Sequence, residues 1–311
     1  MINIVCNIDK NYTKYCTVML LSLLENNKSN RMTIYIIASD LTDIDKKIIR
    51  ESISKYDCII CFYDIDDSIL NNCPIREGSY ITVTTYFRIF LSSILPENIE
   101  KVLYLDCDLI VRKDLKDFWD TDIEEYAIAC VEDTCSNVGG EYNPYSRLGY
   151  DRKYSYFNAG VILFNLKYCR EHNIEEKCIN YIKENISHDN KLIYYDQDVL
   201  NAVLHDKKKF VSFTWNTQEG FYRRKRQIRT DVWTDIDKCL KDPAIIHYLG
   251  KRKPWDPNAR YPLRNEWFKY LDMSRWKGER PPHYHWNNFL SALNKLGILL
   301  RIDKPRYISI K

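Results

Sequence analysis

The chain has 311 residues, of which 45% are hydrophobic and 29% charged, with only 9 glycines and 10 prolines. This composition excludes a small disulfide-stapled scaffold, a collagen-like chain and a disordered one, and it suffices for one large domain or a core domain with an appendage. The 46 Lys and Arg against 43 Asp and Glu leave a net charge of +3, which gives no indication of a nucleic-acid partner.

The first half of the chain alternates strand-like and helix-like patterns. Short apolar runs are followed by amphipathic segments, one of which starts after an Asp40-Leu41-Thr42 cap signal. Because such alternation needs crossover connections, it predicts a largely parallel sheet covered by helices, an α/β fold. We expect strands at 2–8, 32–39, 58–65 and 101–111, and helices at 12–25, from the cap through Lys55, and at 84–95.

The second half continues the pattern less regularly. The segment from Asp133 to Ser155 is rich in Gly, Asn, Tyr and Ser, and it is expected to be a long loop beside the site, or else a disordered excursion. We expect further strands at 127–132, 158–165 and 243–249, and helices at 170–186 and 197–204.

The eleven cysteines indicate a reducing compartment. Their number is odd, and the N-terminus lacks the features of a signal peptide, so the sequence predicts a cytoplasmic protein. Cys58 and Cys61 have the spacing of half a zinc site, but no second pair matches it, and we interpret both as strand residues. No stretch approaches the roughly 20 apolar residues of a membrane span.

The strongest local signal is the run Leu103-Tyr104-Leu105-Asp106-Cys107-Asp108. Two carboxylates at i and i+2 of a strand share one face, about 6.5 Å apart. The carboxyl end of a strand is where open α/β sheets bind ligands, and hard oxygen ligands suit Mg²⁺ or Mn²⁺. The alternative is a solvated strand end with two surface acids, since this short motif is common.

Two further segments carry polar groups at element ends. Tyr195-Asp196-Gln197-Asp198 starts a helical pattern, where acids are also ordinary caps. His247-Tyr248-Leu249-Gly250-Lys251-Arg252-Lys253-Pro254-Trp255 follows a strand. There His247 could complete a metal site, Gly250 would allow close backbone approach, and Lys253 could meet a phosphate.

Together these blocks resemble the retaining glycosyltransferases of family 8, which include bacterial lipopolysaccharide galactosyltransferases and glycogenin. The resemblance covers roughly residues 1–270 and rests on collinear blocks rather than on one motif. The blocks are VCNIDKNY at 5–12, TTYFRI at 84–89, KVLYLDCDLIV at 101–111, WDTDI at 119–123, YFNAGVILFNL at 156–166, YDQDVLN at 195–201 and HYLGKRKPW at 247–255.

The resemblance implies a GT-A fold, with a Rossmann-like, mostly parallel sheet flanked by helices, to which the apolar stripe of the C-terminal residues adds a small helical extension. It also implies a UDP-glucose or UDP-galactose donor and a Mn²⁺ ion, or Mg²⁺ in its place. By motif matching, Asp106, Asp108 and His247 would ligate the metal. Gln197 and Asp196 would be the catalytic pair beside the transferred sugar, and Asp133 would lie on the acceptor side. The residues implied to bind the donor are Asn7, Asp9, Asn11, Tyr12, Arg88, Asp106, Asn158, Gly250 and Lys253.

Three departures from the family pattern leave every implied ligand in place. They are Lys10, Cys107 inside the DxD motif, and the basic pair Lys251-Arg252 before Lys253. Lys10 bears on the detail of the uridine pocket.

The block around Gln197 favours one of two retaining mechanisms. An amide is a weak nucleophile, which favours front-face attack by the acceptor, with a leaving phosphate oxygen accepting its proton and Gln197 stabilising the sugar cation. A covalent intermediate on Asp196 or Asp198 is the alternative.

Two other functions compete with a UDP-sugar transferase. A haloacid-dehalogenase phosphotransferase also has an apolar strand before DxD, but Ile110 stands where that class has Thr or Val, and no clear Gly-Asp motif follows. A catalytically silent sugar-nucleotide-binding homologue is disfavoured because all three implied metal ligands are present.

The C-terminal residues differ from the rest in charge. We divide the chain into a transferase domain at 1–270 and a basic amphipathic tail at 271–311, because residues 275–311 carry a net charge of +6. The tail predicts either a peripheral contact with the inner face of a membrane or packing on protein. The acceptor would be a glycan, a glycolipid or a protein-linked sugar, in cell-surface polysaccharide biosynthesis. The apolar stripe of the tail is Trp286, Phe289, Leu290, Leu293, Leu296 and Leu300.

Overall fold

The structure is a computed structural model that describes residues 1–71, 73–75, 82–185, 192–259, 261–282, 284, 293 and 307–308. The strands are β1 (Ile2–Asn7), β2 (Met32–Ala38), β3 (Cys58–Asp64), β4 (Lys101–Leu105), β5 (Leu109–Val111), β6 (Ile128–Glu132), β7 (Phe157–Asn165), β8 (Lys208–Phe210), β9 (Thr217–Gln218) and β10 (Ile245–His247). The helices are α1 (Thr13–Glu25), α2 (Asp43–Ile53), α3 (Leu91–Ile94), α4 (Lys116–Trp119), α5 (Pro144–Leu148), α6 (Leu166–Glu171), α7 (Ile174–Asn185), α8 (Tyr195–Leu204), α9 (Trp233–Leu240) and α10 (Arg264–Leu271).

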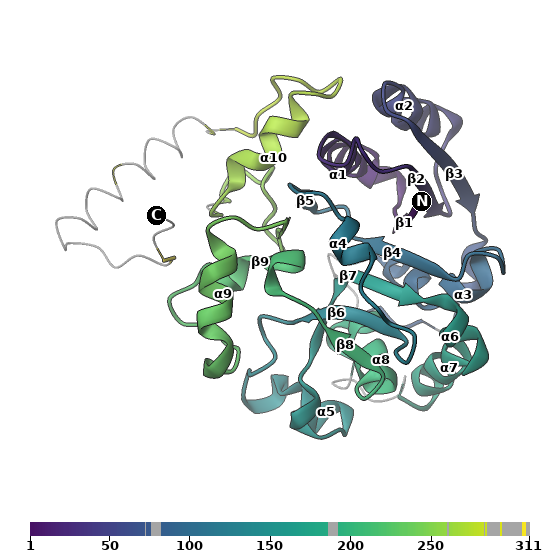
Figure 1. The fold of residues 1–311 in the computed structure, drawn as a ribbon, viewed down its shortest axis with the longest axis vertical. Coiled ribbons are helices and arrows are strands. Elements are labelled where there is room, and N and C mark those ends of the chain that lie inside the picture. Colours follow the sequence, from purple (N-terminus) through teal and green to yellow (C-terminus); the bar gives the residue numbers. More distant parts are fainter. Residues whose placement is uncertain are drawn as a thin grey trace.

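Within the described residues the strands form two sheets (Figure 1). The larger has seven strands in the order β3-β2-β1-β4-β7-β6-β8, and the smaller has the order β5-β10-β9. In the larger sheet β7 runs antiparallel to β4 and β6, and the other neighbours are parallel. This arrangement confirms the predicted α/β class with a mostly parallel sheet.

Helices cover both faces of the larger sheet. One apolar cluster joins the sheet to α1 and α2, where Leu20 and Ile49 are fully buried. A second cluster joins it to α7 and α8, where Cys178 and Leu200 are buried. Figure 1 shows α9 and α10 on one side of the molecule, flanking the smaller sheet, with β3 at the opposite side. Because helices cover both faces of the larger sheet, the ends of its strands are where a site can form.

The predicted single strand at 101–111 is two strands in different sheets. β4 ends at Leu105, and the Asp106 N–H still donates to the Gly160 carbonyl of β7 (2.8 Å). β5 instead pairs antiparallel with β10, with Leu109 opposite His247. The DxD motif is thus the point where the chain passes from the larger sheet to the smaller, and the prediction of one continuous strand was wrong.

Two predicted helices also differ in detail. The expected helix at 84–95 is a 3₁₀ helix at Val83–Ile89 followed by α3. The expected helix at 170–186 is α6 and α7, separated where Asn173 adopts a positive φ of 50°. The long segment at 133–155 is ordered and contains α5. Cys58 and Cys61 both lie on β3, which confirms their interpretation as strand residues, and all eleven cysteines are free thiols.

Described parts of the C-terminal tail contact the domain at 1–270. Tyr284 is buried against Phe268 of α10 with ring centroids 4.7 Å apart, and the Tyr307 hydroxyl donates to Glu219 (2.6 Å). Of the predicted apolar stripe, Leu293 is half exposed, whereas its other five members lie outside the described residues. The domain boundary at 270 therefore stays a prediction.

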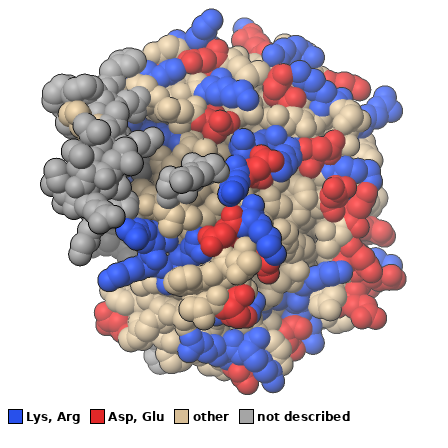
Figure 2. Space-filling model, turned by 60° about the vertical axis from the view of Figure 1, so that its left-hand side comes forward, with Lys and Arg blue, Asp and Glu red and all other residues tan. Residues whose placement is uncertain are grey.

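Two surface properties bear on partners. None of the described helices is long and apolar enough to cross a membrane. On the face shown in Figure 2, Lys and Arg are intermixed with Asp and Glu.

Candidate active site

Most of the predicted site residues line one cavity of about 440 Å³ at the edge of the larger sheet. The carboxyl ends of β1 and β4 open onto it, and so does the start of β7, because an antiparallel strand begins where its parallel neighbours end. Asn11 is not among the lining residues; it is exposed, and its backbone N–H donates to Asp9 (2.8 Å). The predicted residues that line the cavity are Asn7, Asp9, Tyr12, Arg88, Asp106, Asp108, Asp133, Asn158, Asp196, Gln197, His247, Gly250 and Lys253.

Asp106, Asp108 and His247 converge with one ligand atom each within 4.8 Å of the others. The His247 Nε2 atom is 3.1 Å from Asp108 Oδ1 and 3.7 Å from Asp106 Oδ2. Metal–ligand bonds of about 2.1 Å at right angles place neighbouring ligand atoms about 3 Å apart. The spacing therefore fits a divalent cation, and two carboxylates with an imidazole suit Mn²⁺.

Lys253 adds a positive charge beside this cluster. Its ammonium donates to the Asp108 carboxylate and to the Tyr248 carbonyl (2.9 Å). Burial alone would raise the pKa of Asp108, but the positive charge of Lys253 is the largest opposing influence, and that pKa lies well below its usual range. Asp108 is therefore ionised at neutral pH, as a metal ligand must be.

Arg88 joins the DxD motif to α8. Its guanidinium is 2.9 Å from Asp106 Oδ1 and 3.0 Å from Asp196 Oδ2. Thr85 also donates to Asp196 (2.7 Å), and it lies on the same side as Arg88 because residues i and i+3 of a 3₁₀ helix are eclipsed. Burial raises the pKa of Asp196 to about 6 despite the neighbouring Arg88. The 3₁₀ form that replaces the predicted helix thus directs two donors at one carboxylate.

The Gln197 amide is held by hydrogen bonds on both of its polar atoms. Its Oε1 accepts from the Ala159 N–H (2.9 Å) and from Asn158 Nδ2 (3.1 Å). Its Nε2 donates to the Tyr156 hydroxyl (3.0 Å) and to Asp133 Oδ2 (3.3 Å). These four hydrogen bonds therefore fix the orientation of the Gln197 amide at the cavity wall. Burial also raises the pKa of the neighbouring Asp133.

Asp198, one candidate nucleophile, is engaged elsewhere. It is fully buried, and Arg147 binds its two carboxylate oxygens at 2.9 and 3.1 Å. The Tyr156 hydroxyl and the Tyr194 N–H donate to the same carboxylate, each at 2.7 Å. Asp198 is not among the residues that line the cavity, whereas Asp196 is. Asp198 therefore anchors α8, and Asp196 is the carboxylate of this pair that a bound sugar can reach.

The residues matched to uridine binding lie where β1 leaves the sheet. Asn7 Nδ2 donates to the Thr84 carbonyl (2.8 Å), and Asp9 caps the turn that follows. Burial, and next Asp108, raise the pKa of Tyr12, so its phenol stays neutral. The Tyr12 ring packs edge-on against Tyr15, with centroids 5.3 Å apart. These contacts leave a neutral aromatic ring at the cavity wall.

Two residues of the site carry no role in the sequence prediction. Gly160 of β7 faces His247 and Asp106, and a Cβ there would lie 2.2 Å from His247 Cε1. Asn216 is fully buried and its Oδ1 is 2.9 Å from His247 Nδ1. A glycine inside a strand of large apolar residues is a signal for close approach and could have indicated Gly160. Asn216 belongs to no recognisable motif.

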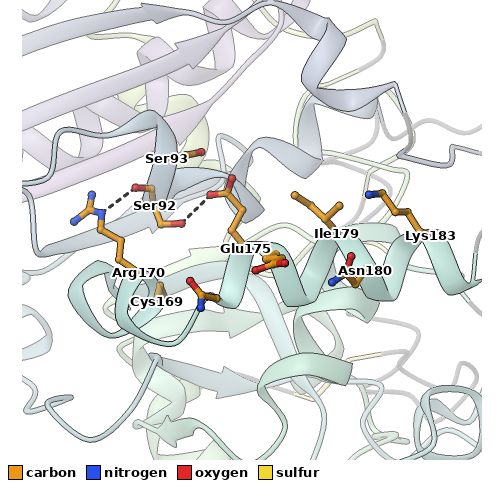
Figure 3. A pocket seen from close by; sticks show the side chains of 10 residues that line it. Ser92, Ser93, Cys169, Arg170, Glu175, Ile179, Asn180 and Lys183 are labelled. Atoms are coloured by element: carbon orange, nitrogen blue, oxygen red, sulfur yellow. Dashed lines mark hydrogen bonds between the residues drawn. The ribbon is translucent and has the colours of Figure 1, made fainter.

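A second hollow, of about 480 Å³, lies between α3 and the α6–α7 pair (Figure 3). Arg170 there donates to the Ser92 carbonyl (2.9 Å) and to other carbonyls up to Ile99 (2.9 Å), while the Ser92 hydroxyl donates to Glu175 (2.8 Å). These groups hold the chain between α3 and β4. None of the predicted site residues lines this hollow.

Comparison with known proteins decides the family. The model of the family described as glycosyl transferase family 8 matches residues 3–259. The chain belongs to glycosyltransferase family 8. This confirms the family that the sequence blocks resemble and the prediction of a glycosyltransferase.

The chain is also similar to individual proteins along most of its length. The chain is 31% identical to general stress protein A of Bacillus subtilis over 279 residues, which cover 89% of this chain and 95% of the relative. It is 27% identical to lipopolysaccharide 1,3-galactosyltransferase of Salmonella typhimurium over 279 residues, 88% of this chain and 79% of that one. The crystal structure of the galactosyltransferase LgtC with donor and acceptor sugar analogues superposes with a TM-score of 0.78 at 22% identity, covering 92% and 99% of the two chains. The LgtC likeness confirms the GT-A fold.

Membership of this family also bears on the competing functions. The family match spans both the DxD motif and His247, so the family 8 enzyme is favoured over a haloacid-dehalogenase phosphotransferase.

Proposed function

We propose that this glycosyltransferase transfers glucose or galactose from a UDP-sugar, with retention of configuration, and depends on Mn²⁺, or on Mg²⁺ in its place. The observation that carries the proposal is the convergence of Asp106, Asp108 and His247 beside Lys253, in the same cavity as Asp196 and Gln197. A nucleotide-sugar donor needs this combination, because its diphosphate demands cations and its sugar demands polar contacts. The names of the relatives, which include lipopolysaccharide galactosyl- and glucosyltransferases, support a hexose.

The residues along the cavity support an order for the donor. We assign the uridine to Asn7, Asp9 and Tyr12, with Asn11 supporting Asp9 from outside the cavity wall. The diphosphate would lie at the metal ligands, near Lys253 and Gly250. Gly250 has a φ of 87°, which disfavours any side chain and leaves its backbone open to a phosphate. The hexose would then meet Arg88, Asn158, Asp196 and Gln197.

The chemistry concerns the departure of the diphosphate. As the bond from the anomeric carbon to the phosphate oxygen breaks, negative charge develops on the leaving group. When bound, a divalent cation supplies Lewis-acid stabilisation of that charge. Lys253 adds a preorganised positive charge in a site that is largely shielded from water. Arg88 holds Asp106 and Asp196 in place, so the ligand set and the sugar contacts are positioned together.

The held amide of Gln197 favours front-face transfer. Both of its polar atoms are already engaged, and an amide oxygen is a weak nucleophile, so it acts by stabilising positive charge on the sugar. The acceptor oxygen then bonds to the anomeric carbon from the side that the diphosphate leaves, and its proton passes to a phosphate oxygen. A covalent intermediate on Asp196 is the alternative, and trapping a glycosyl group on Asp196 would establish it.

We place the acceptor, a glycan, glycolipid or protein-linked sugar, beside Asp133. This carboxylate lies at the cavity wall next to the Gln197 amide. A role in cell-surface polysaccharide synthesis is supported by the lipopolysaccharide transferases among the relatives. The basic tail supports peripheral contact of a cytoplasmic enzyme with the inner membrane face.

The test is release of UDP from UDP-glucose, UDP-galactose and their N-acetyl forms, with and without Mn²⁺. We expect turnover with a glucose or galactose donor and a loss of about 100-fold or more without metal, because a Lewis acid supplies several kcal/mol. Asp108→Asn should lose activity to the same degree while staying folded. Asp117 is an exposed residue of α4, and the control variant Asp117→Asn should keep wild-type activity.

Three results would overturn the proposal. Full activity of Asp108→Asn would show that the proposed metal site is not required for turnover. Hydrolysis of phosphate esters in place of sugar transfer would indicate a phosphotransferase. Binding of UDP without turnover of any donor would indicate a silent homologue.

A further inference from the structure

A buried chain of amide groups leads from His247 to Asp133. His247 Nδ1 is 2.9 Å from Asn216 Oδ1, Asn216 Nδ2 donates to Asn158 Oδ1 (2.8 Å), and Asn158 Nδ2 donates to Asp133 Oδ2 (2.9 Å). All four side chains are buried, and Asn216 is completely inaccessible. The residues come from β10, the turn before β9, β7 and the end of β6, so this network of hydrogen bonds connects both sheets.

One backbone group fixes the direction of every hydrogen bond between these four side chains. The Gly160 N–H lies 3.1 Å from one polar atom of the Asn158 amide. A backbone N–H can only donate, so that atom must be the amide oxygen. The same oxygen faces Asn216, which must therefore present its NH₂ group and turn its own oxygen to His247. His247 Nδ1 must then carry a proton.

The consequence appears at the other ring nitrogen. A neutral imidazole with its proton on Nδ1 has a lone pair on Nε2. This atom faces Asp108 Oδ1 and Asp106 Oδ2 at 3.1 and 3.7 Å. Three acceptor atoms then point at one another, an arrangement that a bound cation stabilises.

We propose that Asn216 is a positioning residue that fixes the tautomer of His247 and so presents Nε2 to the divalent cation. This inference rests on the proposed metal site. Asn158 serves two ends of the cavity, since it orients Asn216 through its oxygen and Gln197 and Asp133 through its nitrogen. The sugar contacts and the metal ligand are thereby held by one network.

The test compares three buried-asparagine variants by Mn²⁺ affinity in titration calorimetry. Asn216→Leu removes the acceptor for Nδ1–H, and we expect a loss of 10- to 100-fold in affinity, the usual effect of removing such a partner. Asn216→Asp keeps an acceptor for Nδ1–H but loses the donor to the Asn158 oxygen, so its loss of affinity should be clearly smaller than that of Asn216→Leu. Asn201→Leu is the matched control, because Asn201 is equally buried and donates to the Phe157 and Gln197 carbonyls (2.8 and 2.9 Å).

A second measurement needs no variant. Nitrogen-15 NMR of the metal-free wild-type enzyme, labelled at histidine, should show His247 with its proton on Nδ1. A proton on Nε2 of the neutral ring would overturn the inference. Wild-type affinity in Asn216→Leu would do the same, as would equal losses in Asn216→Leu and Asn216→Asp, or an equal loss in Asn201→Leu.

His247→Ala separates this inference from the proposed function. If that variant binds Mn²⁺ as tightly as wild type, the metal site itself is wrong. If it loses Mn²⁺ while Asn216→Leu does not, the metal site stands and only the role of Asn216 fails.

Discussion

Replacing Gly160 with alanine should push the metal ligands apart, although no ligand residue is itself changed. Gly160 lies within β7, and its backbone does not need a positive φ, so alanine meets no conformational obstacle there. Space is the obstacle. The added Cβ would lie 2.2 Å from His247 Cε1 and 2.5 Å from Asp106 Oδ2.

The size of the effect follows from these distances. Carbon atoms in contact sit about 3.5 Å apart, so the His247 ring must move by about 1.3 Å or Asp106 must give way. The movement separates two of the three ligands, whereas metal sites tolerate deviations of only about 0.2 Å. A displacement of about 1 Å can cost 100-fold in activity, and we expect a loss of that order in both turnover and Mn²⁺ affinity. Overpacking should also lower the free energy of unfolding by about 1–3 kcal/mol.

The assay is UDP release across a Mn²⁺ titration, with circular dichroism to verify folding. Gly139→Ala is the matched control, because a Cβ there meets nothing within 4 Å, and it should behave as wild type. A folded Gly160→Ala enzyme with wild-type Mn²⁺ affinity and turnover would refute the reasoning that the cavity wall sets the ligand spacing.

Three other expectations concern stability and the tail. Burial lowers the pKa of Lys208 to about 8, below its usual value of about 10.4, so the fold disfavours the charged form and stability rises with pH between these values. Lys208→Met should therefore raise the free energy of unfolding at pH 7 by up to about 3 kcal/mol in urea titrations, and a gain of equal size above pH 10.4 would contradict this. Arg147→Met leaves Asp198 buried without its main counter-charge and should lower the free energy of unfolding by about 3–5 kcal/mol, also measured in urea, and a loss below about 1 kcal/mol would show that Arg147 is not the main partner. Vesicle sedimentation should show binding to anionic but not to zwitterionic vesicles, and changing the basic tail residues to Glu should weaken it by about 1 kcal/mol for each charge, whereas unchanged binding would exclude the electrostatic contact. The residues to change are Lys295, Arg301, Lys304 and Arg306.

Local patterns predicted the elements whose partners are near in sequence. The strands β1 to β3 and the helices α1 and α2 follow the expected alternation, and their apolar spacing sets which face is buried. The DxD carboxylates were predicted from an apolar strand that ends in polar residues. Their relation to His247 came from the family resemblance, since nothing in the spacing alone brings residues 108 and 247 together.

Long-range pairing accounts for what the sequence did not show. The strand at 101–111 divides because Leu109 pairs with His247, a partner far along the chain. The helices α9 and α10 and the strands β8 and β9 were not predicted either. Asn216 gave no signal because its role depends entirely on neighbours from β7 and β10. Gly160 did carry a signal, the single glycine within an apolar strand.

The most direct test of the account is the position of Mn²⁺ in crystals grown with Mn²⁺ and UDP, measured by anomalous diffraction at the manganese edge. The account predicts one strong anomalous peak ligated by Asp106, Asp108, His247 and the UDP diphosphate, with the uracil ring against Tyr12. A peak outside this ligand set, or UDP bound in the cavity with no manganese beside its diphosphate, would contradict it.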